Sequence, residues 1–182
     1  MKKILIKCAV GLVTLVVSFQ TVRNAHGLVK VEGKSMYPTL HDEQTFQAVP
    51  EKPSRLTRGT IIVLNDGIGG LAVKRIVGLP GETVQFHRGD VYINGLRLEE
   101  RYLPDNVRTY GDYRLGDKLK AGKSQYIVLG DNRKCSYDSR MYGDVPIGHI
   151  HGILEMATLA PVILKNSPLA AHSANMGDIA RY

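Results

Sequence analysis

From residue 28 onward, short apolar runs alternate with turn-forming residues, and this pattern constrains the fold more than any other feature of the sequence. The runs at 60–64 (TIIVL), 71–77 (LAVKRIV) and 125–129 (QYIVL) are too short for ordinary helices, and each is followed by Gly or Asn. Such runs are typical of buried strands. With 182 residues and 19 glycines, the chain is predicted to form one main, mostly β domain with many turns.

Further strands are expected at four places along the chain: 28–33, 45–49, 83–87 and 90–98. Asn94 and Gly95 interrupt the last of these, and both residues tolerate a positive φ, so we predict a hairpin there. Residues 99–124 are polar and irregular, which favours a smaller excursion from the main sheet. Residues 130–146 are predicted to form a long polar loop, and one or two more strands are expected in 147–160.

The N-terminal segment is apolar and is preceded by basic residues. Lys2, Lys3 and Lys7 indicate an N-terminus in the cytoplasm with the rest of the chain outside. One interpretation is a cleaved signal peptide, since small residues stand two apart at 25–27 (AHG). The other is a retained anchor at 4–22, which as a helix measures roughly 28 Å, close to the bilayer core of about 30 Å. Periodicity does not separate the two.

The formal net charge of +7 has two interpretations. One is binding to nucleic acid, and the other is proximity to an anionic membrane surface. The sequence contains no long Lys/Arg run, no helix-turn-helix pattern and no interleaving of aromatic and basic residues. The membrane interpretation is therefore favoured, and no nucleic-acid partner is expected.

Cysteine and histidine usage gives little support for a disulfide or a metal site. Cys8 lies in the apolar segment and Cys135 far along the chain, so a disulfide between them is not expected. Cys135 has no evident histidine partner, so a bystander in a loop is favoured over a nucleophile. His149 and His151 share a strand face but lack a third ligand. No metal and no cofactor are predicted.

Two segments carry residues suited to acyl transfer. Ser35 stands in a Gly- and Pro-flanked turn (GKSMYPTL), but a serine is a weak nucleophile that needs a base beside it. Lys74 shares a strand face with Ala72 and Ile76, and such apolar surroundings are expected to lower the pKa of the amine, so that it can act as a base. Considered alone, Ser35 fits an ordinary turn serine, and Lys74 is better explained as an exposed edge lysine that prevents aggregation.

A third segment, GDNRKCSYDSRMYG at 130–143, is dense in paired opposite charges. Such a loop suggests a rigid, salt-bridged support around a site. The alternative is a solvated turn. Taken together with GKSMYPTL and VKRIVGLPGE, in this order behind an apolar N-terminus, the segment resembles the type I signal peptidases (bacterial leader peptidases, peptidase family S26). The similarity runs from about Val29 to Leu154, and VYINGLRLEERYL also resembles the family.

The resemblance implies a mostly β, barrel-like protease domain around a Ser-Lys dyad, with Ser35 as nucleophile and Lys74 as general base. Ser136 is expected to hydrogen-bond the Lys74 amine, and the backbone N–H groups of Gly33 and Ser35 to stabilise the oxyanion. Gly33 stands where some members carry a serine. The resemblance also assigns supporting positions around the site: Met36 beside the dyad, and Arg75 with Asp131 and Arg140 with Asp138 as ion pairs.

The resemblance further implies a substrate class, a location and a division of the chain. The substrates are secreted preproteins, cut at small-x-small sites, and the lipid bilayer is the second partner. Residues 1–24 are expected to be a cytoplasmic tip and a retained single-pass transmembrane helix in the cell membrane. Residues 25–164 form the extracytoplasmic protease domain, and 165–182 form a polar tail.

Three alternatives remain open. A specialised maturation peptidase of a conjugation or pilus system has the same mechanism with a different client. An autoprotease of the kind found in LexA repressors is disfavoured by the apolar N-terminal segment. A catalytically silent, membrane-tethered binding module is favoured only where Ser35 or Lys74 is missing, and both are present.

Overall fold

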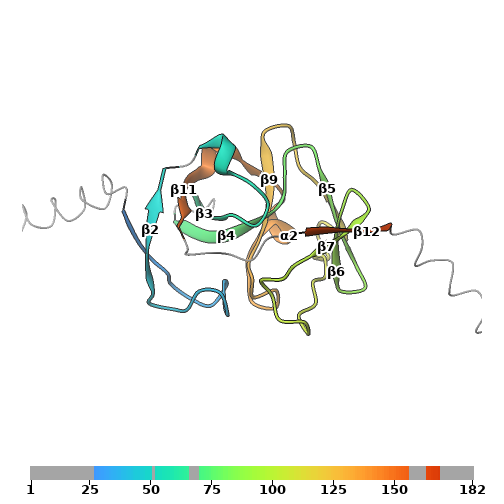
Figure 1. The fold of residues 1–182 in the computed structure, drawn as a ribbon, viewed down its shortest axis with the longest axis horizontal. Coiled ribbons are helices and arrows are strands. Elements are labelled where there is room, and N and C mark those ends of the chain that lie inside the picture. Colours follow the sequence, from blue (N-terminus) through green and yellow to red (C-terminus); the bar gives the residue numbers. More distant parts are fainter. Residues whose placement is uncertain (1–26, 51, 66–69, 156–162, 169–182) are drawn as a thin grey trace, which may run out of the picture.

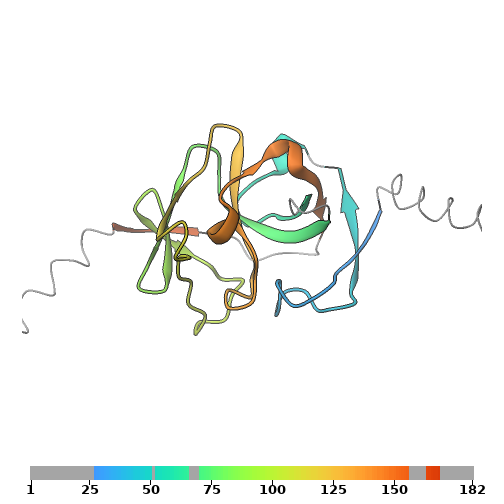
Figure 2. The same ribbon diagram turned by 180° about the vertical axis from the view of Figure 1, so that it is seen from behind.

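The structure, a computed structural model, describes residues 27–50, 52–65 and 70–155, and the backbone of 163–168. It is mostly β, with two antiparallel sheets that lie side by side (Figures 1 and 2). In the part of the chain that the structure describes, no helix combines the length and the apolar character needed to cross a membrane. The predicted anchor at 4–22 lies outside the described residues.

The larger sheet contains the strands that hold the site. Its strands, in spatial order, are β1 (Leu28–Lys30), β2 (Thr45–Val49), β11 (Ile150–Leu154), β3 (Ile61–Asn65), β4 (Leu71–Gly78), β9 (Gln125–Leu129) and β10 (Val145–Pro146). The strands predicted from short apolar runs are thus confirmed. Among the described strands, β1 and β10 are the edges, so the sheet is not a closed barrel.

β4 changes partners halfway along its length. Residues 71–75 pair with β3, whereas 75–78 also pair with β9. The first half of β4 therefore has one edge that no described strand covers. β1 likewise pairs only with β2 among the described strands. These two open edges matter for the site described below.

The smaller sheet has the order β12 (Ile163–Pro168), β7 (Leu96–Glu99), β6 (Asp90–Ile93), β5 (Thr83–His87) and β8 (Lys118–Lys120). The predicted hairpin joins β6 to β7, with φ of 50° at Asn94 and 85° at Gly95. The segment expected to be irregular is partly regular, because β8 returns to pair with β5.

Two regular elements lie where the sequence did not predict them. β12 crosses the expected division between domain and tail, set between 164 and 165, and its Lys165 pairs with Arg97 of β7, while the division itself stays a prediction. A polar composition hid this strand, because pairing at a sheet edge requires backbone groups rather than apolar side chains. The predicted loop at 130–146 contains a short helix, α2 (Ser139–Tyr142), and β10.

An apolar core joins the two sheets. Val84 and Phe86 alternate inward along β5 and pack with Val77, Ile127 and Leu129 of the larger sheet. Period-two alternation thus places the inner face of the smaller sheet against β4 and β9. Two further clusters bury side chains of the larger sheet, and one of them includes Met36 and Leu40 from the turn after β1.

We predict that Gly78→Ala destabilises this junction between the sheets. A Cβ at Gly78 would lie 2.6 Å from Cγ2 of Val84 and 2.9 Å from Cβ of Ile127. Overpacking of this kind costs about 1–3 kcal/mol, measured as the free energy of unfolding in urea. Gly148→Ala is the matched control, since a Cβ there meets nothing within 4 Å. Equal stability of Gly78→Ala and the unmodified protein would contradict the described packing.

Candidate active site

Ser35 lies in the turn between β1 and β2, and its buried neighbours hold it in place. Met36 and Leu40 are almost completely buried and pack with Ile61. The N–H of Leu40 donates to the carbonyl of Met36 over 2.9 Å, which closes the turn. The side chain of Ser35 is therefore attached to an anchored backbone, while the residue itself stays half-buried.

Lys74 reaches Ser35 from β4. Its Nζ lies 3.0 Å from Oγ of Ser35 and donates a hydrogen bond to the carbonyl of Val73, also over 3.0 Å. Only 4% of Lys74 is exposed. The structure thus brings the two predicted dyad residues within hydrogen-bonding distance of each other, and it buries the amine.

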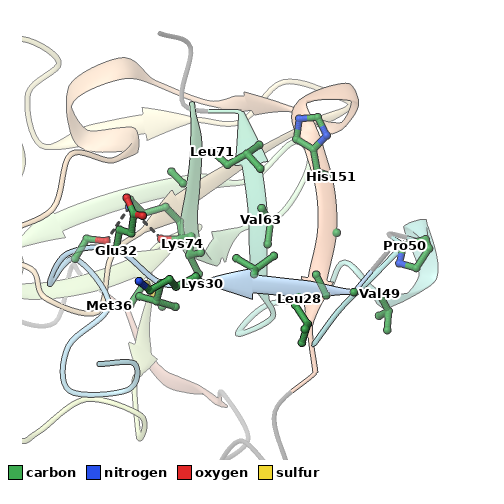
Figure 3. Close-up of a pocket in the computed structure, with 18 residues that line it drawn as sticks. Leu28, Lys30, Glu32, Met36, Val49, Pro50, Val63, Leu71, Lys74 and His151 are labelled. Carbon is green, nitrogen blue, oxygen red and sulfur yellow. Dashed lines mark hydrogen bonds between the residues drawn. The ribbon is translucent and has the colours of Figure 1, made fainter. Parts of the chain in front are cut away.

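A cleft of about 780 Å³ extends from this pair. Figure 3 shows Lys74 near one end of the cleft and His151 and Pro50 at the other. Its walls come mainly from β1 and the first half of β4, the two strands with open edges, and are largely apolar. Leu28 and Leu71 line it and are 72% and 62% exposed. The cleft is therefore a long apolar groove beside two strand edges that no described strand covers.

A buried ion pair joins β4 to the loop after β9. Nε and Nη2 of Arg75 donate to the two carboxylate oxygens of Asp131, over 2.8 and 2.6 Å, and both side chains are at most 1% exposed. Nη1 of Arg75 donates to the carbonyl of Gly59 over 2.7 Å. A bidentate pair of this kind fixes both partners in orientation as well as in distance.

The second predicted ion pair holds the same loop. Nε and Nη2 of Arg140 each donate to Asp138 over 2.8 Å, and Asp138 also caps α2. The other contacts of Asp138 include the N–H of Gly130, which donates to it over 3.0 Å. Oγ of Ser139 accepts from the N–H of Val128 on β9 over 2.9 Å. The loop from 130 to 140 is therefore folded onto itself and onto β9.

Sequence reasoning missed the contacts between this loop and the turn of Ser35. The N–H of Asn132 donates to the carbonyl of Ser35 over 2.9 Å, and its Nδ2 donates to the carbonyl of Lys34 over 3.0 Å. The hydroxyl of Thr39 donates to Asp131. Both residues stand within the quoted motifs, but nothing in their spacing indicated these partners.

One predicted contact is not formed, and a second predicted donor has another partner in the structure. Oγ of Ser136 is buried and accepts or donates no hydrogen bond among the described residues, so the expected bond to Lys74 is not formed. Gly130 lies so close that a Cβ there would be 2.2 Å from this oxygen. The N–H of Gly33 donates to Oδ1 of Asp42 over 2.8 Å and is therefore occupied. The turn at Gly33, with φ of 86°, directs this N–H toward Asp42.

Within the described ranges, no cluster of three or more His, Cys, Asp or Glu side chains is arranged to hold a metal ion.

Comparison with known proteins identifies close relatives. The profile of the family "Signal peptidase, peptidase S26" matches residues 2–159. Signal peptidase I S of Bacillus subtilis (strain 168) is 40% identical over 148 residues, which cover 76% of this chain and 80% of the relative. Signal peptidase I of Bacillus amyloliquefaciens is 45% identical over 117 residues, which cover 60% of this chain and 63% of the relative.

A solved structure is also similar. The crystal structure of a signal peptidase I from Enterococcus faecalis V583 is 34% identical in sequence, with a TM-score of 0.49. The match covers 58% of this chain and 99% of that one. The chain spans less than two thirds of the length of the B. amyloliquefaciens protein that it matches.

We predict that Asp131→Asn strongly destabilises the fold. The substitution leaves the guanidinium of Arg75 buried without a full counter-charge, which costs about 3 kcal/mol or more in the free energy of unfolding. Glu155→Gln is the control, because its ion pair with Arg55 is exposed on both sides and is expected to contribute less than about 1 kcal/mol. Urea unfolding of both variants tests this. Similar small losses in the two would show that the buried pair is not a major constraint.

Proposed function

The chain belongs to the signal peptidase family, peptidase S26, and we propose on this premise that it is a serine endopeptidase that removes signal peptides from secreted preproteins. The observation that carries the proposal is the distance of 3.0 Å between Nζ of Lys74 and Oγ of Ser35. A nucleophile and its base within hydrogen-bond reach are the minimum requirement for covalent catalysis by serine.

Lys74 acts as general base in this proposal. Its burial disfavours the charged ammonium, and a neutral amine can accept the proton of Ser35. Oγ of Ser35 then attacks the scissile carbonyl, and the amine returns the proton to the leaving amino group. The ester on Ser35 is hydrolysed by a water molecule that Lys74 deprotonates in turn.

The oxyanion is stabilised mainly by the backbone N–H of Ser35 in this scheme. The N–H of Gly33 is the second predicted donor, but it is held by Asp42 in the structure. It contributes only when the carbonyl of a bound substrate replaces that carboxylate. Preorganised backbone donors of this kind are among the larger contributions to acyl transfer.

The proposed substrate is an extended peptide that adds as a strand in the cleft. The edges of β1 and β4 that no described strand covers present their backbone along its two walls, the arrangement that strand addition requires. Side chains of such a strand alternate, so every second one enters the apolar floor that includes Met36 and Val63. This geometry supports selection of small residues at alternate positions before the cleavage site.

We further propose that the N-terminal segment 4–22 is a retained, single-pass anchor, with the protease domain outside the cell membrane. The support is the apolar sequence behind three lysines and the excess of positive charge, which suits an anionic membrane surface. The exposed Leu28 and Leu71 at the cleft are consistent with a site that works close to lipid.

We predict that Ser35→Ala and Lys74→Ala each reduce cleavage of a model preprotein in detergent by about 10³-fold or more. Lys118→Ala and Ser124→Ala are matched controls, because both residues are exposed and lie outside the cleft. The products are identified by mass, and a cut after a small-x-small site is expected.

Three other results would contradict the mechanism or replace the proposed function. Full activity of Lys74→Ala would place the base elsewhere and contradict the mechanism. If the unmodified protein cuts one pilin-like client but no general preprotein, the specialised maturation peptidase replaces the proposed function. If the unmodified protein cuts no substrate and Ser35 stays unreactive, the catalytically silent binding module replaces the proposed function.

A further inference from the structure

The candidate site lies in the larger sheet, yet three side chains from a segment that joins two strands of the smaller sheet contact buried arginines beside it. Glu100, Tyr102 and Thr109 belong to the segment between β7 and β8, within the range expected to be a smaller excursion from the main sheet. All three contact one of two buried arginines, Arg75 and Arg133. None of the three lines the cleft.

Arg133 is held mainly by the smaller sheet. Its two terminal nitrogens donate to the two oxygens of Glu100, over 2.5 and 3.1 Å, and Nη1 also donates to Thr109. Nε donates to the carbonyl of Gly130 over 3.0 Å, within its own loop. Burial disfavours the charged guanidinium, but Glu100, Tyr102 and Asp131 together outweigh this effect and raise the pKa of Arg133 above its ordinary value.

Tyr102 connects this group to Arg75. Its hydroxyl donates to Glu100, and its ring lies under the Arg75 guanidinium, with the central carbon 3.9 Å from the ring centroid. Burial and then the nearby charge of Glu100 raise the pKa of Tyr102 well above its ordinary value, so the hydroxyl remains a donor. A guanidinium over a desolvated aromatic face is stabilised and also fixed in its plane.

The buried arginines around the site each have a carboxylate partner only when Glu100, which directly follows β7 of the smaller sheet, is included. Three buried arginines, at 75, 133 and 140, pair with Asp131, Glu100 and Asp138 respectively. Two of these carboxylates come from the loop after β9, and the third, Glu100, comes from the other sheet. A buried cation without its partner is strongly unfavourable. The loop is therefore not self-sufficient and needs Glu100 to keep Arg133 inside.

Both arginines are next to residues of the proposed mechanism. Arg75 follows Lys74 on β4, and Arg133 follows Asn132, which binds the carbonyl of Ser35. We propose that Glu100 and Tyr102 are positioning residues, which hold Arg75 and Arg133 and thereby set the distance between the Lys74 amine and the Ser35 hydroxyl. This inference rests on the proposed function of the dyad. A displacement of about 1 Å at such a site is enough to reduce the rate by up to about 10²-fold.

The test compares Glu100→Gln, Tyr102→Leu and Tyr102→Phe in the full chain in detergent. Cleavage rates are divided by the concentration of reactive Ser35, which is titrated by intact mass with a small β-lactam acylating agent. We expect Glu100→Gln and Tyr102→Leu to lower kcat about tenfold or more while KM stays within about twofold. Tyr102→Phe keeps the ring under Arg75 and is expected to recover most of kcat.

Two matched controls come from the same part of the chain. Glu99→Gln alters the surface ion pair with Arg101, and Tyr113→Leu removes a tyrosine that is 87% exposed. Both are expected to leave kcat within twofold. Should Glu100→Gln fail to fold, the comparison of Tyr102→Leu with Tyr102→Phe still decides the question.

The proposal is overturned if kcat per reactive Ser35 is unchanged in Glu100→Gln and Tyr102→Leu, since their role is then only structural. It is also overturned if KM alone rises, or if Tyr102→Phe is as impaired as Tyr102→Leu. Failure of the proposed function can be distinguished from failure of this positioning role. If the unmodified protein cuts no preprotein, slower acylation of Ser35 by the β-lactam in the variants supports positioning, and unchanged acylation refutes it.

Discussion

The buried pair of Arg75 and Asp131 is the interaction on which the rest of the site depends. Neither side chain reaches solvent, so each needs the other and every remaining polar atom needs a partner. Gly59 and Thr39 supply two of those partners, and the ring of Tyr102 covers the guanidinium. One ion pair thus draws together β4, the turn of the nucleophile, the loop after β9 and the excursion of the smaller sheet.

Strand alternation explains how β4 carries both this pair and the proposed base. Adjacent residues of a strand point to opposite faces, so Lys74 and Arg75 enter different surroundings. Arginine is always charged and suits a permanent bidentate pair, whereas a buried lysine can lose its proton. Exchange of the two residue types would place a permanent charge against Ser35 and a titratable one against Asp131. The proposed mechanism therefore requires the order Lys-Arg on β4.

The sequence was sufficient for features that depend on local periodicity or on a motif. The strands, the hairpin at Asn94-Gly95 and the mostly β class follow from residues that are neighbours in the chain. Three hydrogen bonds were not predicted: those of Asp42 with Gly33, of Asn132 with the carbonyl of Ser35, and of Glu100 with Arg133. Each is a contact between an ordinary polar residue and a backbone group or a distant segment, and no spacing rule connects such partners. β12 was missed because a polar edge strand carries no apolar alternation.

β4 shows how the proposed peptidase site can benefit from a second sheet. Its first half has an open edge at the cleft, and its second half is clamped between β9 and the core that includes Val77 and Val84. A substrate strand that pairs with the open edge pulls on the same backbone that carries Lys74. The clamp resists that pull, because close-packed cores do not deform continuously. We therefore expect the smaller sheet to hold the geometry of the proposed dyad when a peptide binds.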